Sequence, residues 1–235
     1  MTEANAQFDT YALNYEEALQ AGLKVSGEDS GFFASGRIKE TKKAIDRLRL
    51  ACERQKALDF GCGTGNATES LQEAFRFETV QGVDVSAESL AVARGRFSNP
   101  SVSFETIENT APRGDVDLAF CNGVFHHIEP SGRRDSMAYI YASLKPGGIF
   151  VFWENNPWNP GVHYIMKAIP FDRDAQMIFP HRAVKLLGNA GFKVLRLRYF
   201  FVFPRALAGL RLLEPALSSL PLGAQYQIVA VKAPR

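Results

Sequence analysis

Short apolar runs alternate with amphipathic stretches through the middle of the chain. The apolar runs have strand length and predict strands at 56–60, 79–84, 102–106, 116–121 and 149–154. The stretches between them repeat apolar residues at helical spacing and predict helices at 66–75, 87–96 and 132–143. Strands that alternate with helices are typical of βαβ units, so the pattern predicts an α/β fold with a parallel sheet.

The pattern changes after residue 155. Prolines punctuate residues 155–180, which predicts a long loop or lid. A helix is predicted at 181–190, and two further apolar runs predict strands at 194–203 and 225–231.

An apolar segment at about 204–224 separates these two strands. Pro204, Pro215 and Pro221 interrupt it, so it cannot cross a bilayer as one helix. Three interpretations stay open: a buried cap, a dimer contact, or contact with a membrane surface or a lipid-like acceptor.

Residues 1–50 carry helical patterns. Phe8, Tyr11, Ala12 and Tyr15 recur at the spacing of one helical face, and a second pattern predicts a helix ending near Leu48. We expect these residues to form an N-terminal helical cap on a domain that spans 51–235.

Composition narrows the class of protein. The 235 residues are 46% hydrophobic and 22% charged, which is enough apolar material for one core. A formal charge of +2 is too small to indicate nucleic acid as a partner. The three cysteines form no C-x-x-C pair, so no metal site is predicted. With no signal-peptide pattern and no apolar run of about 18 residues, we expect a cytoplasmic protein, monomeric or homodimeric.

The most informative stretch is Leu-Asp-Phe-Gly-Cys-Gly-Thr-Gly-Asn at 58–66. Its glycines lie between a predicted strand and a predicted helix, where the backbone can approach a ligand closely. The nicotinamide fingerprint would place glycine or alanine at position 66, but that residue is Asn66. Asp59 also precedes the first glycine, which further disfavours a nicotinamide-dependent oxidoreductase.

Asp59 followed by G-x-G-x-G resembles the first motif of class I S-adenosylmethionine-dependent methyltransferases. Three later segments, at 79–86, 117–128 and 144–148, resemble further motifs of that family in the expected order. The resemblance implies a Rossmann-like, seven-stranded, mostly parallel sheet with helices on both faces and a terminal antiparallel hairpin. It also implies S-adenosylmethionine as the cofactor and S-adenosylhomocysteine as the product.

The same resemblance implies the cofactor-binding residues. In the family, the acid before the glycines meets the methionine ammonium, and the acid ending the second strand binds the ribose, as Asp84 would here. The full set is Asp59, Gly61, Cys62, Gly63, Gly65, Asp84, Val85, Glu108, Asn122 and Tyr15. Glu108 would meet the adenine, although its surroundings depart from the family's Gly-Asp-Ala pattern. Tyr15 could instead belong to a packed aromatic stripe.

Candidate catalytic residues follow the fourth and fifth predicted strands. Methyl transfer from a sulfonium needs little acid–base machinery, but a histidine could remove a proton from an acceptor. His126 and His127 are adjacent and cannot both point inward, so we predict His126 as the base. Glu154 is predicted to bind the acceptor. Alternatively, one histidine is structural and Glu154 forms a salt bridge.

The segment Trp-Glu-Asn-Asn-Pro-Trp-Asn-Pro at 153–160 is similar to part of a bacterial subset of these methyltransferases whose substrate is largely undefined. Trp153, Trp158, Tyr164 and Phe171 suggest an apolar acceptor pocket. The predicted function is methyl transfer to a small or amphipathic acceptor at an undecided atom. The alternatives are a nicotinamide-dependent oxidoreductase and a non-catalytic nucleotide-binding module.

Overall fold

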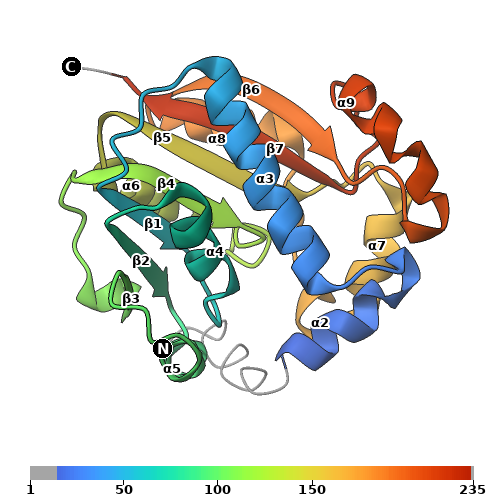
Figure 1. Cartoon of the computed structure of the whole chain (residues 1–235), viewed down its shortest axis with the longest axis horizontal. Coiled ribbons are helices and arrows are strands. Elements are labelled where there is room, and N and C mark those ends of the chain that lie inside the picture. The colour runs from blue at the N-terminus through green and yellow to red at the C-terminus, as the bar shows by residue number, and fades with distance from the viewer. Residues whose placement is uncertain (1–14, 234–235) are drawn as a thin grey trace.

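The structure is a computed structural model that describes the backbone of residues 15–233 and side chains from residue 17 (Figure 1). Its described residues contain a seven-stranded sheet in the order β3-β2-β1-β4-β5-β7-β6. The strands are β1 (Lys56–Phe60), β2 (Thr79–Asp84), β3 (Val102–Thr106), β4 (Val116–Asn122), β5 (Leu144–Asn155), β6 (Phe192–Phe200) and β7 (Gln225–Lys232).

Strands β1 to β5 pair in parallel, whereas β7 is antiparallel to both β5 and β6. The predicted α/β fold, with a mostly parallel sheet and a terminal antiparallel hairpin, is therefore confirmed. Almost all of β4 is buried, because helices cover both faces of the sheet.

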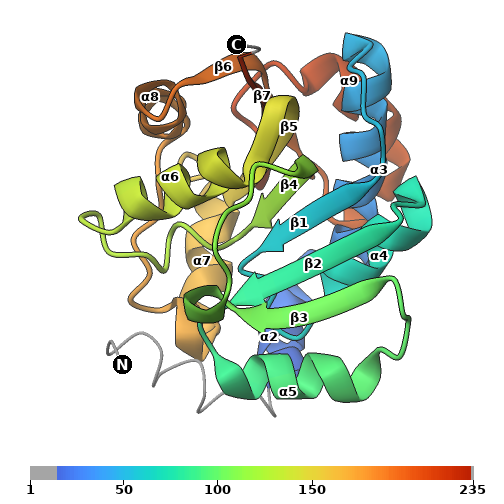
Figure 2. The ribbon, with the colours of Figure 1, turned by 90° about the vertical axis from the view of Figure 1, so that its left-hand side faces the viewer.

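Two pairs of helices cover the sheet (Figure 2). Helices α6 (Arg133–Ser143) and α8 (Pro180–Asn189) pack on one face through Met137, Ile140, Ala183 and Leu187. Helices α3 (Ser30–Leu48) and α4 (Asn66–Phe75) pack on the other face through Ile38, Ile45, Leu71 and Phe75. Helix α5 (Ala87–Arg96) lies along β2 and β3, with Leu90 and Ala93 against Phe104.

The segment predicted as a loop at 155–180 contains two helical elements. Helix α7 (Pro160–Ala168) begins at Asn159, whose side chain accepts hydrogen bonds from the amides of Gly161 and Val162. The 3-10 helix η3 (Pro170–Asp172) follows. Pro160 therefore starts a helix rather than breaking one, because the first helical position needs no amide donor.

Helix α7 packs against α2 (Tyr15–Leu23) beyond the carboxyl ends of the parallel strands (Figure 1). The 3-10 helix η1 (Lys24–Ser26) and a left-handed Gly27 connect α2 to α3. Helix α3 starts at Ser30 because the Asp29 side chain accepts a hydrogen bond from the Phe32 amide and caps it. Thus the segments around residues 15–30 and 155–180 together cover the binding edge of the sheet.

The apolar segment between β6 and β7 forms η4 (Arg205–Leu213) and α9 (Glu214–Leu217) at the surface. It exposes leucines at positions 207, 210, 212, 213, 220 and 222. These side chains are therefore not a buried cap of this chain. In the described part of the chain, every helix is too short or too polar to span a membrane.

Candidate functional site

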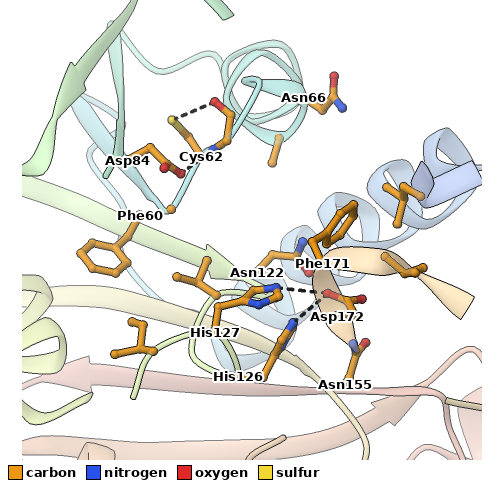
Figure 3. A pocket seen from close by; sticks show the side chains of 18 of the residues that line it. Phe60, Cys62, Asn66, Asp84, Asn122, His126, His127, Asn155, Phe171 and Asp172 are labelled. Atoms are coloured by element: carbon orange, nitrogen blue, oxygen red, sulfur yellow. Dashed lines mark hydrogen bonds and ion pairs between the residues drawn. The ribbon is translucent and has the colours of Figure 1, made fainter. Parts of the chain in front are cut away.

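A cavity of about 680 Å³ opens at the carboxyl ends of β1, β2 and β4. The glycine-rich loop after β1 forms one end, and α2, α3 and α7 form the far wall. Figure 3 shows Cys62 and Asp84 on one side of this space and His126, His127 and Asp172 on another. Ligands of open α/β sheets bind at this edge, so the cavity is the candidate site.

The glycine loop is held close to β2. The amides of Gly61 and Cys62 both donate to the carbonyl of Val83, at 2.8 and 3.1 Å. A Cβ at Gly61 would lie 2.3 Å from Val124 Cγ2, whereas a Cβ at Gly63 would meet open space. The two glycines therefore serve different needs, since Gly61 permits close packing and Gly63 leaves room beside the cavity.

Asp84 ties the end of β2 to this loop. Its Oδ2 accepts a hydrogen bond from the Gly63 amide at 2.8 Å, and its Oδ1 accepts one from the Ser86 amide at 2.9 Å. Both bonds fix the carboxylate at the cavity, which Asp84 and Val85 line. A fixed carboxylate there suits a pair of ribose hydroxyls.

Two buried polar groups face the cavity beneath the loop. Thr68 Oγ1 donates to Asp59 Oδ2 at 2.7 Å. Burial raises the pKa of Asp59 to about 7, even though the Thr68 bond lowers it. Asn122 Oδ1 is buried and has no hydrogen-bond partner among the described residues. A carboxylate and an unpaired amide oxygen fit the ammonium end of S-adenosylmethionine, so the donor set suits that cofactor.

The structure brings together most of the predicted cofactor residues. Those that line the cavity are Asp59, Gly61, Cys62, Gly63, Asp84, Val85 and Asn122. Gly65 instead lies against Phe104 at the start of α4. Glu108 is exposed in η2 (Ile107–Asn109) and does not line the cavity, whereas Ile107 does. The side chain of Tyr15 lies outside the described residues.

A buried cluster joins the loop after β4 to β5 and to the lid segment. His126 Nδ1 lies 2.6 Å from Glu154 Oε2, and His126 Nε2 lies 3.6 Å from Asp172 Oδ1. His127 Nε2 lies 3.1 Å from the same Asp172 oxygen. Glu154 also accepts a hydrogen bond from the Phe125 amide at 2.7 Å. Figure 3 shows both imidazoles directed at Asp172.

These contacts argue against the prediction that His126 is the base. Burial by itself lowers the pKa of His126, but the carboxylates of Glu154 and Asp172 outweigh it and raise the pKa to about 10. Both ring nitrogens face carboxylates, which favour the protonated imidazolium over the neutral ring that a base needs. Burial and the neighbouring His126 charge lower the pKa of His127. The pKa of Asp172 falls to about 2, because its contacts with the two imidazoles outweigh its burial. No motif in the sequence pointed to Asp172, so its part in this cluster was not predicted.

The apolar wall of the cavity differs from the predicted one. Of the four aromatic residues proposed for it, Phe171 lines the cavity and the other three do not. Trp153 is core and donates to Thr41, Trp158 packs on Phe179, and Tyr164 is 63% exposed. The apolar side chains that α2, α3, α7 and the residue after α7 contribute to the wall are mostly aliphatic: Leu19, Leu23, Phe33, Val162, Ile165, Met166 and Ile169.

Comparison with known proteins agrees with this geometry. Residues 57–148 match the family described as "Methyltransferase domain". Trans-aconitate 2-methyltransferase of Rhodopseudomonas palustris (strain BisB5) is 27% identical over 140 residues, which cover 60% of this chain and 54% of that protein. The chain thus spans about half the length of the curated relatives it matches.

Solved structures share the fold. An S-adenosylmethionine-dependent methyltransferase from Mesorhizobium loti superposes with a TM-score of 0.58 at 20% identity, covering 79% of this chain and 94% of that one. The [4+2]-cyclase SpnF gives a TM-score of 0.59 at 20% identity, covering 84% and 81%. A protein named as a cyclase shares the fold, so the fold by itself does not define the reaction.

Proposed function

We propose that this chain, whose residues 57–148 form a class I S-adenosylmethionine-dependent methyltransferase domain, transfers the methyl group to a small, partly apolar acceptor. One observation carries the proposal. A single cavity extends from the glycine loop and Asp84 to the His126–Asp172 cluster and the α7 wall. Cofactor and acceptor would therefore share one protected space. Nothing in the family match favours a nicotinamide-dependent oxidoreductase.

S-adenosylmethionine supplies a methyl group that its sulfonium already activates. The chain's own residues would bind the cofactor, orient the acceptor and exclude water from the space between them. Asp84 would hold the ribose, while Asp59 and Asn122 would hold the ammonium end of the cofactor. Apolar residues of α7 would press the acceptor toward the methyl group. Alignment of this kind can supply about 7–11 kcal/mol. The proton that a hydroxyl or amine acceptor releases on methylation would pass to solvent at the mouth of the cavity.

The charges around the cavity narrow the acceptor class. Its described lining contains the carboxyl groups of Asp59, Asp84, Glu129 and Asp172, whereas its positive groups are Arg37 and His126. A tricarboxylate such as trans-aconitate would meet more negative than positive groups there. We therefore infer that the acceptor is neutral or cationic, with a hydroxyl or an amine as the methylated group.

Formation of S-adenosylhomocysteine tests this function. The purified chain is incubated with methyl-labelled cofactor and a panel of apolar alcohols, apolar amines and trans-aconitate. We expect label in at least one alcohol or amine and none in trans-aconitate. The assay is repeated with a small-molecule extract of the host cell. If the chain binds the cofactor but transfers its methyl group to no compound of the panel or the extract, the non-catalytic alternative is supported. Efficient methylation of trans-aconitate would overturn the charge argument.

Cofactor affinity should depend on pH through Asp59. A cationic group bound beside Asp59 favours its carboxylate form, so binding releases the proton that Asp59 retains below a pKa of about 7. The affinity for S-adenosylhomocysteine should then rise about tenfold between about pH 6 and about pH 8. Calorimetry at several pH values measures this. The Asp59→Asn variant should bind more weakly and show a flatter profile, and a flat profile for the unmodified chain would refute the assignment.

The apolar wall should determine acceptor binding without affecting the cofactor. Ile165 lines the cavity, whereas its neighbour Tyr164 is exposed. Ile165→Glu should lower kcat/KM for the acceptor at least tenfold, because losing contact with two methylenes already costs about 1.6 kcal/mol. Tyr164→Glu is the matched control and should leave it unchanged. Equal effects of both variants, measured in the methyl-transfer assay, would mean that α7 does not contact the acceptor.

A further inference from the structure

We propose that His126, His127 and Asp172 form a binding site for a divalent metal ion of the zinc type in the wall of the cavity. Each residue offers one ligand atom, and these atoms all lie within 4.8 Å of one another. The residues come from two distant segments, the loop after β4 and η3. No spacing motif joins them, which is why the sequence analysis predicts no metal site.

The two distances from the imidazoles to Asp172 match those of a shared ion. A tetrahedral zinc ion with ligands about 2.0–2.1 Å away places its ligand atoms about 3.3 Å from one another. His127 Nε2 lies 3.1 Å and His126 Nε2 lies 3.6 Å from Asp172 Oδ1. Two imidazoles and one carboxylate also form a donor set that zinc and similar ions accept, with a further position left for a substrate atom.

The residues around the cluster support the same interpretation. Metal-binding histidines usually donate their other ring N–H to a carboxylate, which fixes the ring. Glu154 Oε2 is placed to accept such a bond from His126 Nδ1 at 2.6 Å, and the Phe125 amide donates to Glu154 in turn. The Gln176 amide donates to the His126 carbonyl at 2.8 Å and so ties the chain after η3 to the histidine loop. The three ligands are therefore held in place from both segments.

An ion-paired cluster without metal is the competing account. A proton on His126 would make the same contacts with Glu154 and Asp172, and the metal ion would replace that proton. The two accounts differ in function. A metal ion beside the cavity would hold a hydroxyl oxygen or an amine nitrogen of the acceptor, whereas an ion pair would only fix the lid. This role rests on the proposed methyl transfer, but metal binding itself does not.

Titration with Co²⁺ tests the site, because its visible absorption reports the coordination geometry. Tag-free full-length chain is treated with a chelator and titrated without cofactor. We expect one equivalent of Co²⁺ to give an intense visible band of four- or five-coordinate geometry, and one equivalent of Zn²⁺ to remove it. His127→Ala and Asp172→Asn should lose the band. His181→Ala, a change at an exposed histidine, should retain it.

A variant of Glu154 separates a metal site from an ion pair. Glu154→Gln keeps an oxygen for the Phe125 amide but weakens the orientation of His126, so Co²⁺ affinity should fall about 10- to 100-fold with the band shape retained. Circular dichroism checks that each variant folds. Absence of a saturable one-to-one band, or equal Co²⁺ binding by folded Asp172→Asn, would overturn the proposal. Calorimetry with S-adenosylhomocysteine on the same samples tests the proposed function independently.

Discussion

Replacing Asp84 with alanine should lower the affinity for S-adenosylhomocysteine by about 10²- to 10⁴-fold. The variant loses two charge-assisted hydrogen bonds to the ribose, each contributing about 1.5–3 kcal/mol, and every 1.4 kcal/mol is about a tenfold change. It also frees the Gly63 and Ser86 amides, which Asp84 now fixes at 2.8 and 2.9 Å. Calorimetry of the purified variant measures the loss directly.

Glu88→Ala provides the matched control for this experiment. Glu88 is an exposed acid in the first turn of α5, four residues beyond Asp84. Removing it changes the net charge equally but leaves the loop contacts intact. We expect cofactor affinity to stay within about twofold, because exposed charges contribute little. Equal affinity in both variants would mean that Asp84 does not bind the ribose.

Substitutions in the glycine loop should separate folding from binding. Gly61→Ala places a Cβ 2.3 Å from Val124 at a φ of +72°, so overpacking and strain together should cost about 2–5 kcal/mol of unfolding free energy. Gly63→Ala meets open space at a φ of +52° and should cost only about 1–2 kcal/mol. Its methyl group would stand beside the cavity and should weaken cofactor binding. Urea unfolding and calorimetry measure the two effects.

Gly147→Ala isolates the backbone cost. Gly147 has a φ of +81°, and its added Cβ would also meet open space, but it does not line the cavity. This variant should lose about as much stability as Gly63→Ala while keeping full cofactor affinity. If Gly63→Ala binds the cofactor as tightly as Gly147→Ala does, the loop does not approach the ligand at that position.

Local pattern was sufficient to predict the parallel part of the sheet. The strands at 56–60, 79–84 and 102–106 agree with the structure to the residue, because each is a short apolar run bounded by loop residues. The lid was harder. Its prolines suggested a loop, yet Asn159 and Pro160 are also the cap and first residue of a helix. That start signal was in the sequence and was outweighed by proline content.

The acceptor end of the site could not be derived from neighbouring residues. Asp172 meets His126 and His127 only because α7 and η3 fold over the sheet edge. The preference for His126 as a base likewise rested on its position after β4. Its protonation depends on Glu154 and Asp172, which are distant in sequence. Glu108 was chosen from its place after β3, but η2 turns its side chain toward solvent.

A crystal structure of the chain with S-adenosylhomocysteine tests the central claim most directly. The account predicts ribose hydroxyls on the Asp84 carboxylate and an amino group near Asp59 and Asn122. It further predicts that the sulfur faces the part of the cavity between α7 and the His126–Asp172 cluster. A ligand bound elsewhere, or a sulfur facing away from that space, would contradict methyl transfer within this cavity.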